Sequence, residues 1–168
     1  SLGACGDVQR NVLCCPAPLH DNEVRRQMQH TARAISDAFL PKSRAYHEIW
    51  LGDPDTGQRD LVNPPEDVEP LYGKTYLPRK FKVALALPED NCIDVHANDV
   101  GLLAIHDGAR LLGYNVLIGG GMGMTPSNKK TFPSVAQPMT FVTPDQVLPL
   151  VEAVLKVHRD YGNREDRK

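Results

Sequence analysis

The chain has 168 residues, of which 24% are charged, and 19 Lys and Arg against 21 Asp and Glu give a formal net charge of −2. This length supports a single domain over residues 1–168 with its own hydrophobic core, and the near-neutral charge gives no bulk electrostatic reason to bind nucleic acid or a membrane surface. No apolar run approaches the roughly 20 residues that a membrane-spanning helix requires.

The first third of the chain predicts an arm, a helix, a strand and a loop. Residues 1–20 hold turn formers and prolines and are interpreted as an N-terminal arm. Asp21 or Asn22 can cap the helix that follows, and Pro41 ends it near Leu40. Its apolar positions recur at helical spacing: Val24, Met28, Ala32, Ile35 and Phe39. Residues 45–51 predict a short strand, and the polar stretch 52–70 predicts a surface loop.

The rest of the chain predicts a sheet and a second helix. Residues 80–87 alternate like a strand, and residues 100–106 and 111–118 read as a hairpin whose turn contains Asp107 and Gly108. A glycine run follows at 119–123, and a helix is predicted over 144–161, capped by Thr143 and ended by Gly162. This order favours the α+β class, with a mixed β-sheet and helices packed on one face.

Three cations lie within four positions of the predicted strand at 80–87. The two-residue period of a strand places Lys80 and Lys82 on one face, beside Arg79. Like charges repel, so this arrangement is easiest to accept if an anion or a polyanionic cofactor lies between them, although a solvated strand face remains open. Arg10, after a Gly-Asp turn, could likewise present its guanidinium to an oxyanion or lie on a short capped helix.

The glycine run is a second candidate for ligand contact. Without side chains, Gly119, Gly120 and Gly121 let a ligand approach the backbone, and the cations Lys129 and Lys130 follow. A dinucleotide-binding fingerprint would open a helix at this point, whereas prolines follow instead, so that interpretation is rejected. A flexible exit from the hairpin remains the alternative.

The four cysteines, Cys5, Cys14, Cys15 and Cys92, show no C-x-x-C spacing. They are therefore expected to be free thiols in a reducing, cytoplasmic compartment, and no metal ligand is predicted. The polar cluster at 94–99 could line a site or make a turn.

Three stretches, 3–12, 75–82 and 119–121 with 128–131, resemble assimilatory sulfite reductase hemoproteins of the sirohaem nitrite/sulfite reductase superfamily. The likeness keeps its order over nearly the whole chain, including residues 44–51, 94–99 and 159–164. Since both ends look cut, the resemblance suggests an internal fragment from the first of two similar halves, facing the sirohaem.

The resemblance implies a function and a set of site residues. The family reduces sulfite to sulfide with six electrons in sulfur assimilation, using sirohaem and a [4Fe–4S] cluster, with electrons from a flavoprotein subunit or a ferredoxin. By the resemblance, Arg10, Lys80 and Lys82 belong to the anion site. The expected sirohaem contacts are Asn11, Arg79, Gly119, Gly120, Gly121, Asn128, Lys129 and Lys130.

This sequence departs from the family in its cysteines. The cluster ligands, expected as two spaced pairs, are absent, so no cysteine here is predicted as a cluster ligand. The isolated chain is expected to be inactive, and whether it holds either cofactor stays open. A nitrite reductase of the same superfamily and a non-catalytic anion- or tetrapyrrole-binding module remain alternatives.

Overall fold

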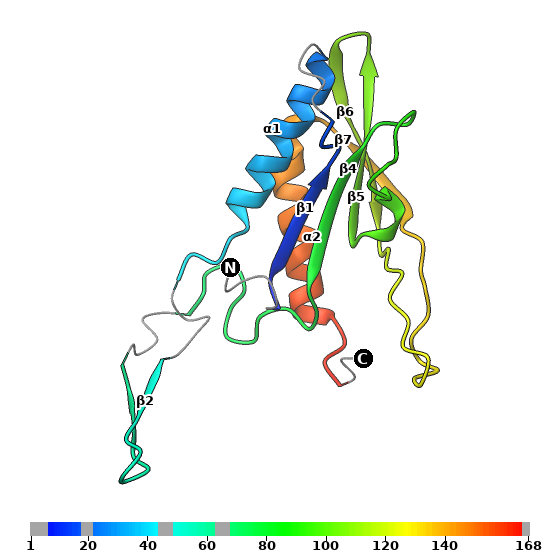
Figure 1. Ribbon diagram of the computed structural model, residues 1–168. Coiled ribbons are helices and arrows are strands. Elements are labelled where there is room, and N and C mark those ends of the chain that lie inside the picture. The colour runs from blue at the N-terminus through cyan, green and yellow to red at the C-terminus, as the bar shows by residue number, and fades with distance from the viewer. Residues whose placement is uncertain (1–6, 18–21, 44–48, 63–67, 166–168) are drawn as a thin grey trace.

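Five strands form one mixed sheet in the computed structural model, which describes residues 7–17, 22–43, 49–62 and 68–165 (Figure 1). The strand order is β1-β4-β5-β6-β7. The first three neighbours are parallel, and β5, β6 and β7 pair antiparallel. Their bounds are β1 Gln9–Cys14, β4 Phe81–Ala86, β5 Val100–Asp107, β6 Arg110–Ile118 and β7 Gln137–Val142.

The two helices begin and end where local sequence signals place them. In α1 (Glu23–Ala38), the Asn22 side chain accepts a hydrogen bond from the Arg25 N–H at 3.0 Å, and the predicted apolar positions are buried. The second helix begins with a 3₁₀ turn, η3 (Pro144–Gln146), and continues as α2 (Val147–Tyr161), with Thr143 in a capping box. Neither described helix is long and apolar enough to cross a membrane.

Both helices cover the same face of the sheet (Figure 1). On β4, Phe81, Val83 and Leu85 point into this main core, together with the buried sides of α1 and α2. The predicted α+β class, with helices on one face of a mixed sheet, is therefore confirmed.

The opposite face carries a smaller core. Its small residues Ala84 and Ala86 alternate with the large ones of the main core, and Val95 and Ala136 pack over them. Small side chains let a short connection lie close to the sheet, and this connection contains the 3₁₀ turn η2 (Val95–Ala97). The same packing places η2 beside the end of β6, since the Gly120 N–H donates to the Asn98 carbonyl at 3.1 Å.

Two strands of the five-stranded sheet were not predicted from the sequence. β1 lies inside the predicted N-terminal arm, because a register shift between Gln9 and Asn11 interrupts the alternation that would reveal it. β7 contains Pro138 and exposes most of its side chains. Such a strand is tolerated at the sheet edge, where one side of the backbone needs no partner.

A short exposed hairpin extends away from the sheet (Figure 1). It pairs β2 (Trp50–Gly52) with β3 (Arg59–Leu61), and Trp50 is 52% exposed. Most of the strand predicted over 45–51 lies outside the described residues, and the stretch 52–70, predicted as a loop, contributes β3.

Candidate functional site

A cleft of about 820 Å³ lies at the edge of the sheet where β4 and β5 begin and β6 ends. Parallel strands start at the same edge, and the antiparallel pairing of Val100 with Ile118 brings the end of β6 there as well. The walls come from residues before β4 and β5, from the chain after β6 and from the end of α2. The lining residues are Asp7, Pro78, Arg79, Lys80, Asp99, Gly119, Gly120, Gly121, Gly123, Met124, Thr125, Lys130, Thr131, Phe132, Ser134 and His158.

The cleft is rich in cationic side chains. Arg79, Lys80 and Lys130 line it and are exposed, so their charges are accessible to a ligand. His158 adds an imidazole ring from the last turn of α2, with Nε2 3.4 Å from the Arg79 carbonyl oxygen. This set complements an anion or a ligand with several carboxylates.

Asp99 is a carboxylate among these cations. Its Oδ2 accepts a hydrogen bond from the Lys82 backbone N–H at 2.8 Å, and its carbonyl accepts the Gly119 N–H at 3.0 Å. Burial raises the pKa of Asp99 above its ordinary value of 3.8, although the Lys82 N–H and the charges of His158, Lys82 and Arg79 act in the opposite direction. Asp99 therefore joins the starts of β4 and β5 to the end of β6, and it retains a proton more readily than an exposed aspartate.

The three glycines differ in what they do. Gly119 has a positive φ of +82°. At Gly120, an added Cβ would lie only 2.3 Å from the His96 carbonyl oxygen, so no larger residue fits there. A Cβ on Gly121 would meet nothing within 4 Å. All three N–H groups already donate to backbone carbonyls, those of Asp99, Asn98 and Ser134 respectively. The run therefore gives a ligand space at Gly121 rather than a set of available N–H donors.

Arg10, Asn11 and Lys82 lie beside the cleft without lining it. Asn11 pairs with Lys82 across β1 and β4, and Arg10 is exposed at the register shift between Gln9 and Asn11. Phe81 packs into the main core, so Lys82 lies on the sheet face away from the helices, while Lys80 precedes the strand. The convergence of Arg10 with the two lysines stays a prediction.

The Asn11 side chain bears one unusual feature. Its Oδ1 is buried and has no hydrogen-bond partner among the described residues. A buried acceptor of this kind costs roughly 1–3 kcal/mol unless a donor reaches it. Asn11 is therefore the member of this group whose geometry favours an additional polar partner.

The segment 128–130 is divided between structure and cleft. The Asn128 side chain accepts a hydrogen bond from the Lys130 N–H at 3.0 Å, and its carbonyl accepts one from the Thr131 hydroxyl at 2.8 Å. Asn128 thus shapes the turn, and Lys130 lines the cleft, whereas Lys129 is exposed outside the lining.

Sequence reasoning did not select Asp7, His158 or Phe132. His158 was expected to have an ordinary surface or core role, and helical periodicity alone does not show that the last turn of α2 reaches the start of β4. For Asp99 a signal existed, because the polar cluster at 94–99 was considered as a possible site lining.

Comparisons with known proteins agree on one family. The model of the nitrite and sulphite reductase 4Fe-4S domain matches residues 5–168. The chain is 48% identical to a Shewanella loihica protein and 50% identical to a Geobacillus thermodenitrificans protein, each named sulfite reductase [NADPH] hemoprotein beta-component. Each match covers 100% of this chain and 29% of the relative, so the chain spans less than a third of their length.

A fungal relative and a solved structure extend the likeness. The sulfite reductase [NADPH] subunit beta of Schizosaccharomyces pombe is 49% identical over 170 residues, and the match covers 100% of this chain and 12% of that protein. The structure of the Mycobacterium tuberculosis NirA protein matches with a TM-score of 0.57 and 27% identity, covering 98% of this chain and 23% of that one.

Proposed function

Because the chain belongs to the nitrite and sulphite reductase 4Fe-4S domain family, we propose that it is part of a sirohaem enzyme that reduces sulfite to sulfide with six electrons. The names of relatives at 48% and 50% identity support sulfite over nitrite as the substrate. Their designation as NADPH beta-components supports a separate electron-donating component, a flavoprotein rather than a ferredoxin. The activity belongs to the longer protein, to which this chain contributes anion and cofactor contacts.

The observation that carries the proposal is a cleft lined by both cationic side chains and the glycine run. Arg79, Lys80 and Lys130 surround a space of about 820 Å³. A hydrogen bond between such a cation and an anionic ligand contributes roughly 1.5–3 kcal/mol. In the proposal Arg10, Lys80 and Lys82 hold the anion, and Arg79, Lys129 and Lys130 hold the carboxylates of the macrocycle.

The donor set of the cleft fits sirohaem and not the cluster. Sirohaem is a polycarboxylate, which suits several cations and the open surface at Gly121. A [4Fe–4S] cluster requires four thiolates, and the described cysteines lie at the far end of β1 and after the far end of β4, away from the cleft. We therefore place the cluster ligands in other parts of the longer protein.

The residues of this chain would act on charge and protons. When bound, sirohaem supplies an iron that can ligate sulfite and transfer electrons to it. The Lys80 ammonium would stabilise the negative charge of the anion and donate from Nζ one of the two protons with which an oxygen leaves as water, the second proton coming from solvent. The Asp99 carboxylate accepts a hydrogen bond from the Lys82 backbone N–H and so positions the start of β4. Asn11 would donate from Nδ2, while its Oδ1 accepts from a group on the ligand or a bound water.

The test is sulfide production by the longer protein with reduced methyl viologen as the electron donor. We expect Lys80→Ala and Lys82→Ala to lower turnover with sulfite far more than they lower stability, because neither side chain is part of the core. Arg110→Ala, at the exposed hairpin turn at the other end of the sheet, is the matched control and should keep wild-type turnover. Wild-type turnover in both lysine variants would contradict the proposal.

The same assay distinguishes substrates and the role of this chain. A higher specificity constant with nitrite than with sulfite would assign the enzyme to the nitrite-reducing branch. The isolated 168-residue chain should produce no sulfide after incubation with sirohaem, iron and sulfide followed by desalting. Sulfide formation by the isolated chain would show that our assignment of the cluster ligands is wrong.

A further inference from the structure

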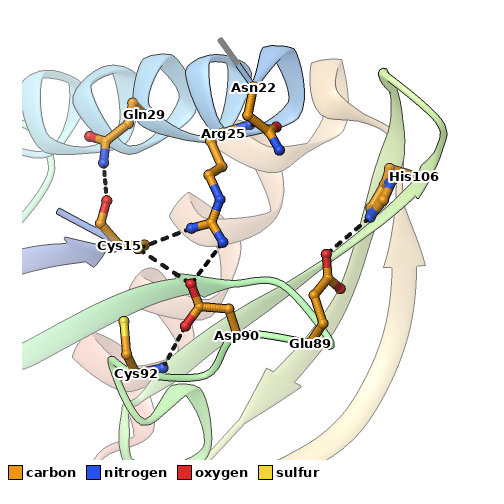
Figure 2. A network of polar contacts seen from close by, with 8 residues as sticks. All are labelled: Cys15, Asn22, Arg25, Gln29, Glu89, Asp90, Cys92 and His106. Carbon is orange, nitrogen blue, oxygen red and sulfur yellow. Dashed lines mark hydrogen bonds and ion pairs between the residues drawn. The ribbon is translucent and has the colours of Figure 1, made fainter. Parts of the chain in front are cut away.

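Two cysteines and an aspartate from distant parts of the chain meet at the end of the sheet opposite the cleft. Cys15 directly follows β1, whereas Asp90 and Cys92 lie in the connection after β4 (Figure 2). Cys15 and Asp90 are 75 residues apart in the sequence. They meet because β1 and β4 are parallel neighbours, so that the chain leaves both strands at the same edge.

The positions of these side chains are fixed by the backbone around them. The Asp90 N–H donates to the Leu87 carbonyl at 3.2 Å, which closes the turn after β4. The Cys15 carbonyl accepts a hydrogen bond from Gln29 Nε2 at 2.5 Å, which ties the end of β1 to α1. The two Sγ atoms and a carboxylate oxygen all lie within 4.8 Å of one another.

Arg25 connects two members of this group (Figure 2). Its Nη1 donates to Cys15 Sγ at 3.0 Å, and its Nη2 donates to Asp90 Oδ2 at 2.8 Å. Its side chain is only 16% exposed, so the guanidinium is held against these two groups rather than in solvent. The Cys15 thiol also donates to Asp90 Oδ2 at 3.5 Å, and the second carboxylate oxygen of Asp90 accepts the Cys92 N–H at 3.4 Å, so Asp90 contacts both cysteines.

We propose that Cys15, Asp90 and Cys92 bind a thiophilic divalent metal ion of the zinc class, with Arg25 as the outer donor that orients two of the ligands. Zinc takes thiolate sulfur at about 2.3 Å and carboxylate oxygen at about 2.0–2.2 Å. Ligand atoms around one tetrahedral ion are then about 3.5–4 Å apart, and the distance between Cys15 Sγ and Asp90 Oδ2 is already 3.5 Å, with all three ligand atoms within 4.8 Å of one another. Cys92 is exposed and can move to close that gap.

The charges of the group support this assignment. Once metal binding has released the two thiol protons, two thiolates and a carboxylate carry three negative charges, which a divalent ion and the Arg25 guanidinium neutralise together. Hydrogen bonds from a second-layer donor to metal ligands are a recurring feature of metal sites. The exposed position of Cys92 leaves a fourth coordination position open to solvent. This site is separate from the cleft, and its existence does not depend on the proposed reductase activity.

The test is zinc binding to the 168-residue chain, kept reduced with a phosphine and titrated against a chromophoric chelator. We expect one zinc ion per chain, and with cobalt as a probe we expect sulfur-to-metal charge-transfer absorption. Cys92→Ser and Asp90→Asn should each weaken zinc binding by more than about 100-fold, and Arg25→Lys by about 10–100-fold. Cys14→Ala is the matched control, because Cys14 packs against the main core, and it should keep the wild-type affinity.

Two readouts separate binding from folding. Thermal unfolding in a chelator should be the same for wild type and Cys92→Ser, since Cys92 is exposed, and zinc should raise the unfolding temperature of the wild type alone. Equal zinc affinity in wild type and Cys92→Ser would overturn the proposal. So would a reduced wild-type chain that binds no zinc but forms a Cys15–Cys92 disulfide when the phosphine is removed.

Discussion

Alanine at Gly120 should destabilise the chain, whereas alanine at the adjacent Gly121 should not. A Cβ on Gly120 would lie 2.3 Å from the His96 carbonyl oxygen, and 2.6 and 2.9 Å from the Asn98 carbonyl oxygen and nitrogen. All three atoms belong to the backbone, so η2 and the connection to β5 would have to move. Overpacking of this kind costs typically about 1–3 kcal/mol, and a clash with backbone on three sides favours the upper end of that range.

Gly121 is the matched control. Its Cβ would meet nothing within 4 Å, and its φ is outside the left-handed region. Gly121→Ala should therefore leave the free energy of unfolding within about 0.5 kcal/mol of wild type or raise it slightly, because alanine restricts the unfolded chain. Gly119→Ala, at φ +82°, should lie between the two, with a cost of about 1–2 kcal/mol.

Urea unfolding of the isolated chain, followed by circular dichroism, measures these differences. The reasoning is refuted if Gly120→Ala is as stable as wild type. It is also refuted if Gly121→Ala loses as much free energy of unfolding as Gly120→Ala does. The same pair tests the site in the longer protein. If the surface at Gly121 faces the macrocycle, Gly121→Ala should weaken sirohaem retention without a loss of stability.

Three further predictions concern the buried carboxylates and the thiols. Glu69 is 1% exposed, and its Oε2 accepts from the Lys42 N–H, the Ser43 N–H and the Ser43 hydroxyl. Glu69→Ala should lower the free energy of unfolding, measured in urea, by about 3 kcal/mol, and Glu69→Gln should lower it by about half as much. A loss below about 1 kcal/mol for Glu69→Ala would contradict this prediction. Since the folded-state pKa of Asp99 is raised, its contribution to stability is present below the ordinary value of 3.8 and lost as pH rises above it. The stability of wild type relative to Asp99→Asn should therefore fall as pH rises above 3.8, and parallel pH profiles would exclude this effect. A thiol titration of the freshly purified chain, denatured in a chelator without reductant, should find all 4 cysteines; a lower count in a sample protected from air would indicate a disulfide.

Local sequence signals determined the helices and the central hairpin. Asn22 and the apolar spacing of α1 act within a few residues of each other, and so do Asp107 and Gly108 at the turn between β5 and β6. Gly108 has φ +55°, as that turn requires. These elements were predicted correctly because the interactions that fix them join residues close together in the sequence.

Strands β1 and β7 depend on partners that the sequence does not show. The register shift at β1 exists only opposite β4, and Pro138 is acceptable in β7 only because β7 lies at the edge. The cleft likewise depends on segments that are distant in the sequence. The cations Arg79, Lys80 and Lys130 could be selected from the sequence, but the position of Asp99 among them depends on how β4, β5 and β6 align.

The glycine run shows how tertiary structure can change the meaning of a motif. From the sequence, Gly119, Gly120 and Gly121 are equivalent and suggest close approach of a ligand. In the fold, one adopts a positive φ, one packs against the backbone of η2, and one borders open space. The sequence determines that side chains are absent at these positions, and the neighbouring segments decide what each absence does.

The cysteines give the clearest contrast. Adjacent Cys14 and Cys15 and the distant Cys92 lack the short spacing by which metal sites are found in a sequence, and no metal ligand was predicted from them. Cys14 packs toward the main core, while Cys15 meets Asp90 and Cys92. Short spacings reveal ligands that one turn or loop brings together, whereas the parallel pairing of β1 with β4 brings these groups together across 75 residues, which only the tertiary structure decides.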